Sequence, residues 1–423
     1  MTKKIPFHLI PHDLSFTDNI IVESAKEYGT PLYLYDRKKM ESNWKELVNH
    51  LPINVNIYYS VKANPNLAII KIFDELGANF EVASIGELKS VLQVGVAPSR
   101  IIFVGPGKTT EEIKYAIRKN IGAIISESHR EVYDIQAHSY SLNKITPIAL
   151  RINPGHGKGM LAMGGETQFG MDMEKAFHTI QDVNKLPNVE IIGIHGYLGT
   201  QILDSQVIIE HSRKLLEIAD ELQKRSGKSF SFIDIGGGFG VPYHENDSQL
   251  NLNDLYSGME YLVDTYIEKH PYVNNIAVES GRFLVSSSGV FVTRVIDIKK
   301  SSKQTFVILD GGINVFGGFD RYVGWRPTPF RLLNRDYSEE SSLTLCGPLC
   351  TPIDRLATNI LLPLPKVNDL LIFYKAGAYG YTASPGLFLS HGYPSEILVS
   401  QDKAFLIRQR MSFNDMITNQ KYY

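Results

Sequence analysis

Cysteine is scarce in this chain, and positive charge is not in excess. The 423 residues include only Cys346 and Cys350, and the formal net charge is −2 at pH 7. Two thiols cannot build a disulfide framework, and they lack the companion ligands of a structural zinc site. General nucleic-acid binding needs a strong basic field, which a balanced charge does not supply. We therefore expect neither a metal nor a nucleic-acid partner.

Long hydrophobic runs are absent as well. No apolar stretch approaches the roughly 18 residues of a membrane span, and residues 1–6 lack the apolar run of a secretion signal. We therefore expect no membrane partner and a cytoplasmic location. Hydrophobic residues nevertheless make up 43% of the chain. This share is typical of a globular protein with a large core.

Short β-rich runs alternate with longer helical patterns between about residues 56 and 282. The first run, 56–61, precedes Ile69, Ile72, Phe73 and Leu76, whose spacing places them on one helical face. Further β-rich runs occupy 80–82, 101–104, 123–125, 147–152, 189–194, 230–235 and 276–279. Roughly eight strands that alternate with helices predict an α/β fold, a parallel (β/α)8 TIM-like barrel.

The pattern changes after Arg282. Residues 290–295 and 305–309 are β-rich, and few long helical patterns follow. We therefore predict two domains. The barrel takes residues 37–282, and a mainly β domain takes residues 1–36 together with 283–423.

Lys62 is the first candidate for chemistry. It follows an apolar strand and precedes a helix, and the active site of such a barrel lies at the carboxyl ends of its strands. Partial burial there favours the neutral amine, which reacts with aldehydes. Taken alone, the residue is better explained as a solvated loop lysine.

Two further motifs follow later strands. Gly236, Gly237 and Gly238 allow backbone N–H groups to approach a phosphate closely, although a tight turn would also explain them. Glu279, at the end of the last barrel strand, would keep a neighbouring pyridinium protonated. Arg282 would bind a phosphate or a carboxylate through two hydrogen bonds. The ordinary alternative for the last two residues is a surface ion pair.

Two segments of the β-rich part complete the pattern. They read Cys-Gly-Pro-Leu-Cys-Thr-Pro-Ile-Asp at 346–354 and Gly-Ala-Tyr-Gly at 377–380. In this order, from about residue 30 to 400, the motifs resemble the fold-type III pyridoxal-phosphate decarboxylases, which include diaminopimelate and ornithine decarboxylases. The resemblance implies an alanine-racemase-like barrel, pyridoxal 5′-phosphate as the cofactor and a homodimer with shared active sites.

The resemblance also assigns roles within the barrel. Lys62 matches the lysine that holds the cofactor as a Schiff base, and Glu279 matches the acid at the pyridine nitrogen. Family members usually carry a stacking histidine three residues before a phosphate-binding hydroxyl. Here that place is taken by Tyr197, whose ring can still stack, and His195 is expected to be a buried neighbour. The residues that match phosphate-binding positions are Thr200, Gly236, Gly237, Gly238, Ser280, Gly281 and Arg282.

The resemblance implies that the β domain completes the site of a second chain. Cys350 matches a cysteine that enters the partner's site, where either this cysteine or Lys62 is expected to return a proton after decarboxylation. Tyr379 matches a tyrosine that reaches the partner's phosphate. Asp354 matches an acid near the distal end of the substrate, and we expect Arg321 or Arg326 to bind a distal carboxylate or acyl group there.

The chain departs from diaminopimelate decarboxylases where those enzymes bind the distal end of their substrate. Thr351-Pro352 replaces Glu-Ser after the cysteine, and residues 383–391 replace an Asn-Tyr-Asn stretch. Losing the partner of a buried charge costs about 3–5 kcal/mol, enough to change the substrate. The pattern is similar to the decarboxylases of butirosin and staphyloferrin B assembly.

We therefore predict decarboxylation of an α-amino acid that carries a conjugated acyl side chain. The substrate is a small molecule or is linked to a carrier protein in siderophore or secondary-metabolite synthesis. Three alternatives stay open: diaminopimelate decarboxylation, amino-acid racemisation and a non-catalytic cofactor-binding protein.

Overall fold

In the computed structural model the chain forms two compact units. The barrel unit consists of Trp44–Pro242 and Ser248–Phe283, and the β unit consists of Met1–Asn43, Tyr243–Asp247 and Leu284–Tyr423. The structure describes residues 13–155, 167–244, 246–302, 304–317, 328–333 and 340–423.

The chain divides at 43/44 and 283/284, whereas the sequence pattern placed the boundaries at 36/37 and 282/283, so residues 37–43 group with the β unit. Residues 243–247 group with the β unit, although the sequence pattern placed them in the barrel. Tyr243 explains the difference, because its hydroxyl lies 2.7 Å from the hydroxyl of Ser286 in the same unit. At the first boundary, Asn43 donates to the carbonyl of Leu284 at 3.0 Å.

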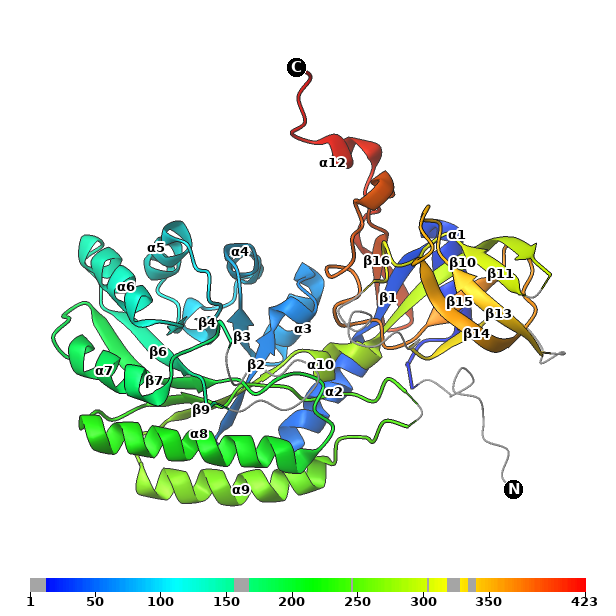
Figure 1. The fold of residues 1–423 in the computed structure, drawn as a ribbon. Helices are drawn as coiled ribbons and strands as arrows, with labels where there is room; N and C mark the ends of the chain where they lie inside the picture. The colour runs from blue at the N-terminus through cyan, green and yellow to red at the C-terminus, as the bar shows by residue number, and fades with distance from the viewer. Residues whose placement is uncertain (1–12, 156–166, 245, 303, 318–327, 334–339) are drawn as a thin grey trace. The chain divides into compact units, whose positions relative to one another are not determined.

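Eight parallel strands close the barrel in chain order, as the sequence pattern predicted (Figure 1). The strands are β2 (Val55–Ser60), β3 (Asn79–Val82), β4 (Ile101–Phe103), β5 (Ala123–Ser126), β6 (Thr146–Ile152), β7 (Val189–Gly196), β8 (Phe232–Asp234) and β9 (Asn275–Ser280). Most of their residues are buried on both faces. Apolar side chains fill the interior, among them Tyr58, Ile102, Ile125, Ala149 and Phe232. The barrel interior is therefore packed, and polar chemistry is confined to its ends.

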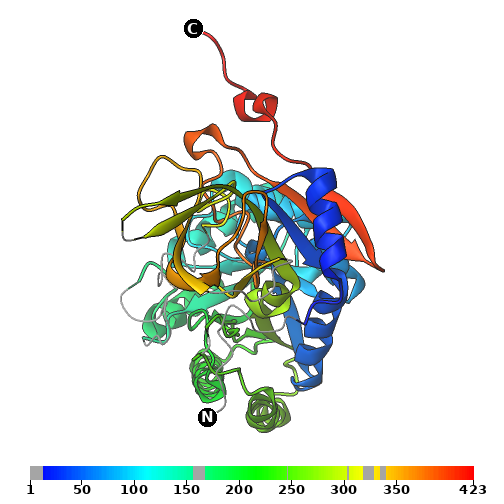
Figure 2. The same cartoon turned by 90° about the vertical axis from the view of Figure 1, so that its right-hand side faces the viewer.

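Helices cover the outside of the barrel strands (Figure 1). They are α3 (Leu67–Glu75), α4 (Ile85–Val94), α5 (Thr110–Lys119), α6 (His129–Ser141), α7 (Met173–Val183), α8 (Ser205–Ser226) and α9 (Leu252–Lys269), and α2 (Arg37–Asn49) crosses the unit boundary. The helices α8 and α9 lie side by side and are seen end-on in Figure 2.

The sequence pattern located α3 correctly. Ile69, Ile72 and Phe73 are buried as expected, whereas Leu76 is only half-buried at the end of the helix. Among the described residues, no helix combines the length and the apolar character needed to cross a bilayer.

The second unit is mainly β, as predicted. Its strands are β1 (Leu32–Asp36), β10 (Gly289–Lys300), β11 (Thr305–Leu309), β12 (Phe330–Leu332), β13 (Glu340–Cys346), β14 (Arg355–Pro363), β15 (Leu370–Phe373), β16 (Ser395–Ser400) and β17 (Lys403–Arg408). The short helices are α1 (Asp18–Tyr28), α10 (Arg282–Val285), which spans the boundary, and α12 (Phe413–Ile417). The N-terminal strand β1 pairs antiparallel with β10 and parallel with β16, so residues from both ends of the chain share one sheet.

Candidate active site

The carboxyl ends of the barrel strands carry ionisable side chains, beginning with Lys62. It lies in a single helical turn, Val61–Ala63, directly after β2. Its Nζ donates a hydrogen bond to Oε1 of Glu81 on β3 at 3.0 Å. Burial raises the pKa of Glu81, the charge of Lys62 opposes this shift, and the charge of Glu279 adds to it. The Lys62 side chain is 35% exposed, so solvent reaches part of it.

Strand β9 places the segment from Glu279 to Arg282 beside that lysine turn. Ser280 is the parallel partner of Tyr59 on β2. A Cβ atom on Gly281 would lie only 2.7 Å from the Cβ of Ala63. Glycine therefore permits a close approach that any larger residue would prevent.

The glycine run after β8 is enclosed by the neighbouring strand ends. Gly236 has a φ of +73°, and a Cβ atom there would lie 2.3 Å from the carbonyl oxygen of Gly196. A Cβ on Gly237 would lie 2.3 Å from the carbonyl oxygen of Glu279. The space between β7 and β9 thus admits only glycine, which exposes backbone N–H groups instead of side chains.

The loop after β7 joins this run. Ile202 N–H donates to the carbonyl of Gly238 at 2.8 Å. A Cβ on Gly238 would lie 2.8 Å from the carbonyl oxygen of Gly199. Thr200 lies between Gly199 and Ile202, so the structure brings its segment against the glycine run. Two of the three predicted phosphate-binding segments are therefore neighbours in the fold.

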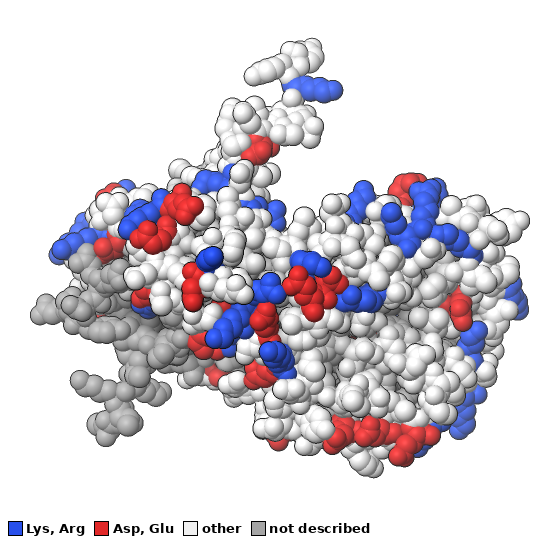
Figure 3. Space-filling model, turned by 180° about the vertical axis from the view of Figure 1, so that it is seen from behind, with Lys and Arg blue, Asp and Glu red and all other residues white. Residues whose placement is uncertain are grey.

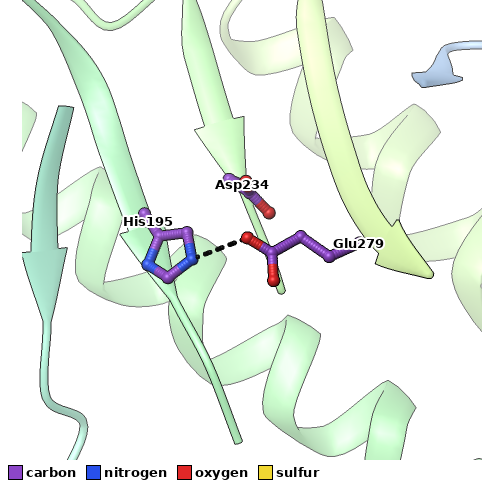
Figure 4. A group of neighbouring side chains, drawn as sticks. All are labelled: His195, Asp234 and Glu279. Atoms are coloured by element: carbon purple, nitrogen blue, oxygen red, sulfur yellow. Dashed lines mark hydrogen bonds and ion pairs between the residues drawn. The ribbon is translucent and has the colours of Figure 1, made fainter. Parts of the chain in front are cut away.

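His195, Asp234 and Glu279 occupy adjacent strands β7, β8 and β9 and converge inside the barrel (Figure 4). His195 Nε2 lies 3.1 Å from Oε1 of Glu279. Asp234 Oδ1 accepts a hydrogen bond from the N–H of Gly236 at 2.8 Å. The exposed fractions of the three residues are 1%, 0% and 3%, so water does not screen their charges. One side-chain nitrogen of His195 and one carboxylate oxygen from each of Asp234 and Glu279 all lie within 4.8 Å of one another.

A buried ion pair adds two more charged side chains at the ends of β5 and β6. Arg151 Nη1 donates to Oε1 of Glu127 at 2.7 Å. Oε2 of the same carboxylate accepts from the N–H of Gly170 at 2.9 Å, and the guanidinium of Arg151 lies 4.5 Å from the ring centroid of Phe169. The described barrel residues therefore carry ionisable groups at the ends of β2, β3, β5, β6, β7, β8 and β9.

Sequence reasoning assigned no role to several of these groups, namely Glu81, Glu127, Arg151 and Asp234. A usable signal was present in most cases, because a single charge interrupts an apolar run. Examples are Phe80-Glu81-Val82 and Leu150-Arg151-Ile152. A charged residue at the end of a strand buried on both faces indicates a site at the barrel mouth.

The β unit holds the remaining candidates. Cys350 is exposed between β13 and β14. Asp354 is 2% exposed, and its carboxylate accepts from the N–H groups of Ile313 and Leu349, each at 2.8 Å. We infer that Asp354 first shapes the loop that carries Cys350. Substrate contact by Asp354 stays a prediction.

The Gly-Ala-Tyr-Gly segment is a tightly packed turn of the β unit. A Cβ on Gly377 would lie 1.8 Å from the carbonyl oxygen of Val285. Tyr379 has a φ of +58°, a conformation that few residues other than glycine adopt. Close packing against Val285 thus explains Gly377, which the sequence pattern alone did not explain. Two predicted substrate-binding residues, Arg321 and Arg326, lie outside the described residues.

Comparison with known proteins identifies the family. Residues 37–286 match the model of the pyridoxal-dependent decarboxylases, pyridoxal binding domain. The chain belongs to this family. The match confirms the enzyme class and the pyridoxal phosphate cofactor expected from the sequence. It favours decarboxylation over racemisation and over a non-catalytic cofactor-binding role.

Individual relatives of this decarboxylase extend over almost the whole chain. It is 34% identical over 411 residues to the L-glutamyl-[BtrI acyl-carrier protein] decarboxylase of Niallia circulans, covering 95% of this chain and 96% of the relative. It is 30% identical to the 2-[(L-alanin-3-ylcarbamoyl)methyl]-2-hydroxybutanedioate decarboxylase of Staphylococcus aureus, covering 90% and 98%. The Helicobacter pylori diaminopimelate decarboxylase, crystallised with L-lysine, is 31% identical with a TM-score of 0.84, covering 94% and 98%.

The barrel residues of this decarboxylase fit pyridoxal phosphate. Lys62 supplies an amine, and its Nζ lies 5.6 Å from the ring centroid of Tyr197, which offers an aromatic face. The glycine run supplies backbone N–H groups for a phosphate. Glu279 supplies a buried carboxylate, and Lys62 is near enough for its charge to affect the pKa of Glu279.

Proposed function

We propose that this decarboxylase removes carbon dioxide from an α-amino acid whose side chain carries a conjugated acyl group. The substrate is free or bound to a carrier protein, in siderophore or secondary-metabolite assembly. Support comes from two relatives whose names specify a glutamyl group on an acyl-carrier protein and an alaninyl amide of a hydroxy tricarboxylate. Diaminopimelate is the alternative substrate, because diaminopimelate decarboxylases match the chain almost as well.

One observation favours the conjugated substrate. Residues 376–395, which follow β15, contain no aspartate, glutamate, lysine or arginine. This segment therefore offers no carboxylate to a distal ammonium group, and leaving such a charge unpaired is costly. Leu387, Phe388 and Leu389 are instead 57%, 50% and 49% exposed, so they present apolar surface to a bulky acyl group.

The same segment is held in a defined shape. Ser384 Oγ accepts from the N–H of Gly317 at 2.8 Å, and the hydroxyl of Tyr393 donates to the carbonyl of Ser384 at 2.9 Å. The rings of Tyr381 and Tyr393 stack with centroids 4.9 Å apart. Exposed apolar residues on a loop with these anchors are suited to recognition.

We assign the barrel residues as follows. Lys62 bonds covalently to the cofactor aldehyde, Tyr197 stacks on the cofactor ring, and Glu279 accepts a hydrogen bond from the ring nitrogen. When bound, pyridoxal phosphate draws electron density from the α-carbon and takes up the charge left by departing carbon dioxide. The phosphate is held by Thr200, Gly236, Gly237, Gly238, Ser280, Gly281 and Arg282.

We further propose that two copies of the chain form each active site. Tyr379 of one copy reaches the phosphate held by the other, and Cys350 returns a proton to the α-carbon. The exposure of Cys350 supports this role, because a proton donor must reach the reacting atom. A cytoplasmic location is part of the same proposal.

The substrate assignment is tested by carbon dioxide release from matched amino acids. We would compare meso-diaminopimelate and free L-glutamate with an L-glutamate γ-thioester and a side-chain-acylated L-2,3-diaminopropionate. We expect kcat/KM for at least one acylated compound to exceed that for both free amino acids by about a hundredfold, since a site built for one group rejects analogues that lack it.

Preferred turnover of meso-diaminopimelate would contradict the proposal. Borohydride reduction followed by peptide mapping is the control for cofactor loading, and we expect the label on Lys62. A loaded enzyme that acts on none of the four compounds would also contradict the substrate class.

A further inference from the structure

A histidine contacts the carboxylate that we propose binds the cofactor ring nitrogen. His195 and Glu279 are joined by the contact of 3.1 Å between Nε2 and Oε1 (Figure 4). An ionised carboxylate can only accept a hydrogen bond, so Nε2 of His195 carries the proton. Within the described part of the chain, Nδ1 of His195 has no hydrogen-bond partner. Among the described residues, the His195 side chain therefore hydrogen-bonds to Glu279.

Local electrostatics shift the pKa values of Glu279 and Asp234 in opposite directions. Burial alone would raise the pKa of Glu279. The hydrogen bond and charge of His195, with the charges of Lys62 and Arg151, outweigh burial and leave the pKa below its ordinary value. Burial and the charge of Glu279 instead raise the pKa of Asp234 well above its ordinary value, against the hydrogen bond from Gly236. Electrostatics in this cluster therefore favour the ionised form of Glu279 more than that of Asp234.

The contact made by the His195 ring does not follow the strand register alone. His195 on β7 is the parallel partner of Asp234 on β8, yet its ring reaches across to Glu279 on β9 (Figure 4). Tyr197 lies two residues further along the chain, beyond the end of β7. The centroid of the Tyr197 ring lies 5.6 Å from the Lys62 amine, so the rings of Tyr197 and His195 have different polar neighbours.

We propose that His195 is a positioning residue whose Nε2–H holds the Glu279 carboxylate in the orientation and charge state in which it meets the cofactor ring nitrogen. The inference rests on the proposed role of Glu279. Without this donor, a buried carboxylate gains by taking up a proton itself. Glu279 would then compete for the proton that the ring nitrogen needs.

The experiment uses two matched variants that differ in the reach of one amide. In His195→Gln the amide nitrogen takes the place of Nε2 and still donates to Glu279. In His195→Asn the amide is one methylene shorter and occupies the place of Nδ1, so it does not reach the carboxylate. Both side chains are neutral and polar, which separates donation from packing.

Two readouts do not depend on turnover. Equilibrium dialysis of the apoenzyme measures affinity for pyridoxal phosphate, and the ¹⁵N chemical shift of ring-labelled cofactor reports whether its nitrogen is protonated. We expect His195→Asn to weaken affinity by about tenfold or more, because hydrogen bonds to charged groups are strong. We expect its ring nitrogen to shift toward the unprotonated form, and His195→Gln to stay within about threefold of the parent on the same grounds.

Several results would overturn the proposal. Equal behaviour of the Asn and Gln variants would show that reach to Glu279 is irrelevant. A stoichiometric metal in the purified protein would show that His195, Asp234 and Glu279 serve as ligands instead. If His195→Asn does not fold by circular dichroism, ¹⁵N-histidine spectra of the parent holoenzyme decide, and an Nε2 without a proton refutes the inference.

A third variant distinguishes the failure of this inference from the failure of the proposed function. Glu279→Gln removes the carboxylate itself, and we expect it to deprotonate the ring nitrogen as His195→Asn does. A ring nitrogen that stays protonated in Glu279→Gln would refute the role of Glu279. A change in Glu279→Gln with none in His195→Asn would refute the role of His195 alone.

Discussion

His211 shows how strongly burial on the inner face of a covering helix can shift the pKa of one side chain. It lies on α8 and is 7% exposed. Burial lowers its pKa to about 4, the charges of His195 and Lys214 act in the same direction, and a hydrogen bond with the backbone of Ile235 opposes them. The folded protein therefore holds this imidazole neutral over a range in which the unfolded chain protonates it.

This difference predicts acid sensitivity with a defined window. Between pH 6.5 and pH 4 the unfolded chain binds the proton of His211 and the folded protein does not, so stability falls as the pH falls. The loss attributable to His211 is about 3 kcal/mol, because each unit of pKa difference corresponds to about 1.4 kcal/mol. Urea unfolding at several pH values measures it. The variant His211→Gln should have a flatter profile below pH 6.5, and a profile parallel to that of the parent would refute the assignment.

Residue roles could be proposed from the sequence only where a motif indicated them. Lys62 and Glu279 were predicted as site residues because each lies at the end of a recognisable strand run. Glu81 and His195 make their hydrogen bonds with residues that lie far away in the chain. Glu81 lies 3.0 Å from Lys62 and His195 lies 3.1 Å from Glu279. These pairings depend on strand register, which a list of runs does not contain.

At the scale of elements, the glycine run after β8 depends on the close approach of β7 and β9. We predict that Gly236→Ala damages the site because its φ is +73° and its Cβ would lie 2.3 Å from the carbonyl oxygen of Gly196. The matched control is Gly227→Ala, whose φ is +68° with nothing within 4 Å of the added Cβ. Both variants lose about 1–2 kcal/mol for the left-handed backbone, but only Gly236→Ala also forces strand ends apart.

Dialysis against pyridoxal phosphate separates the two effects. We expect Gly236→Ala to lose affinity by about tenfold or more, since overpacking of this kind costs about 1–3 kcal/mol. Gly227→Ala should bind normally despite its lower stability in urea. Normal binding by Gly236→Ala would remove the run from the cofactor site.

Most elements followed from periodicity, whereas the unit boundaries did not. The β-rich runs and the helical face of α3 were readable because burial on both faces or on one face leaves a repeating pattern. Residues 243–247 leave no such pattern. Their place in the β unit depends on single contacts, such as that between Tyr243 and Ser286.

At the scale of the whole molecule, neither sign of charge dominates the surface that can be seen. On the face drawn in Figure 3, acidic and basic side chains occur close together in small groups, in keeping with a net charge of −2. A broad electrostatic field for nucleic acid is not formed on that face.

The proposed shared site makes a prediction for mixed dimers. Lys62→Ala and Cys350→Ala should each be impaired, but subunit exchange creates dimers with one intact site and one doubly defective site. Equal mixing places half of the dimers in this form, so about a quarter of the parent activity should return. Carbon dioxide release before and after exchange measures the recovery. Activity that stays at the sum of the two variants would show that each site lies within one chain.

The boundary between the units also constrains how this protein can change. The chain passes between them at 43/44, 242/243, 247/248 and 283/284, so no single stretch of gene encodes the β unit. A recombination event cannot transfer this unit as an intact cassette between related genes. We therefore expect new substrate preferences in this lineage to arise through substitutions within loops such as 376–395, and not through exchange of a module.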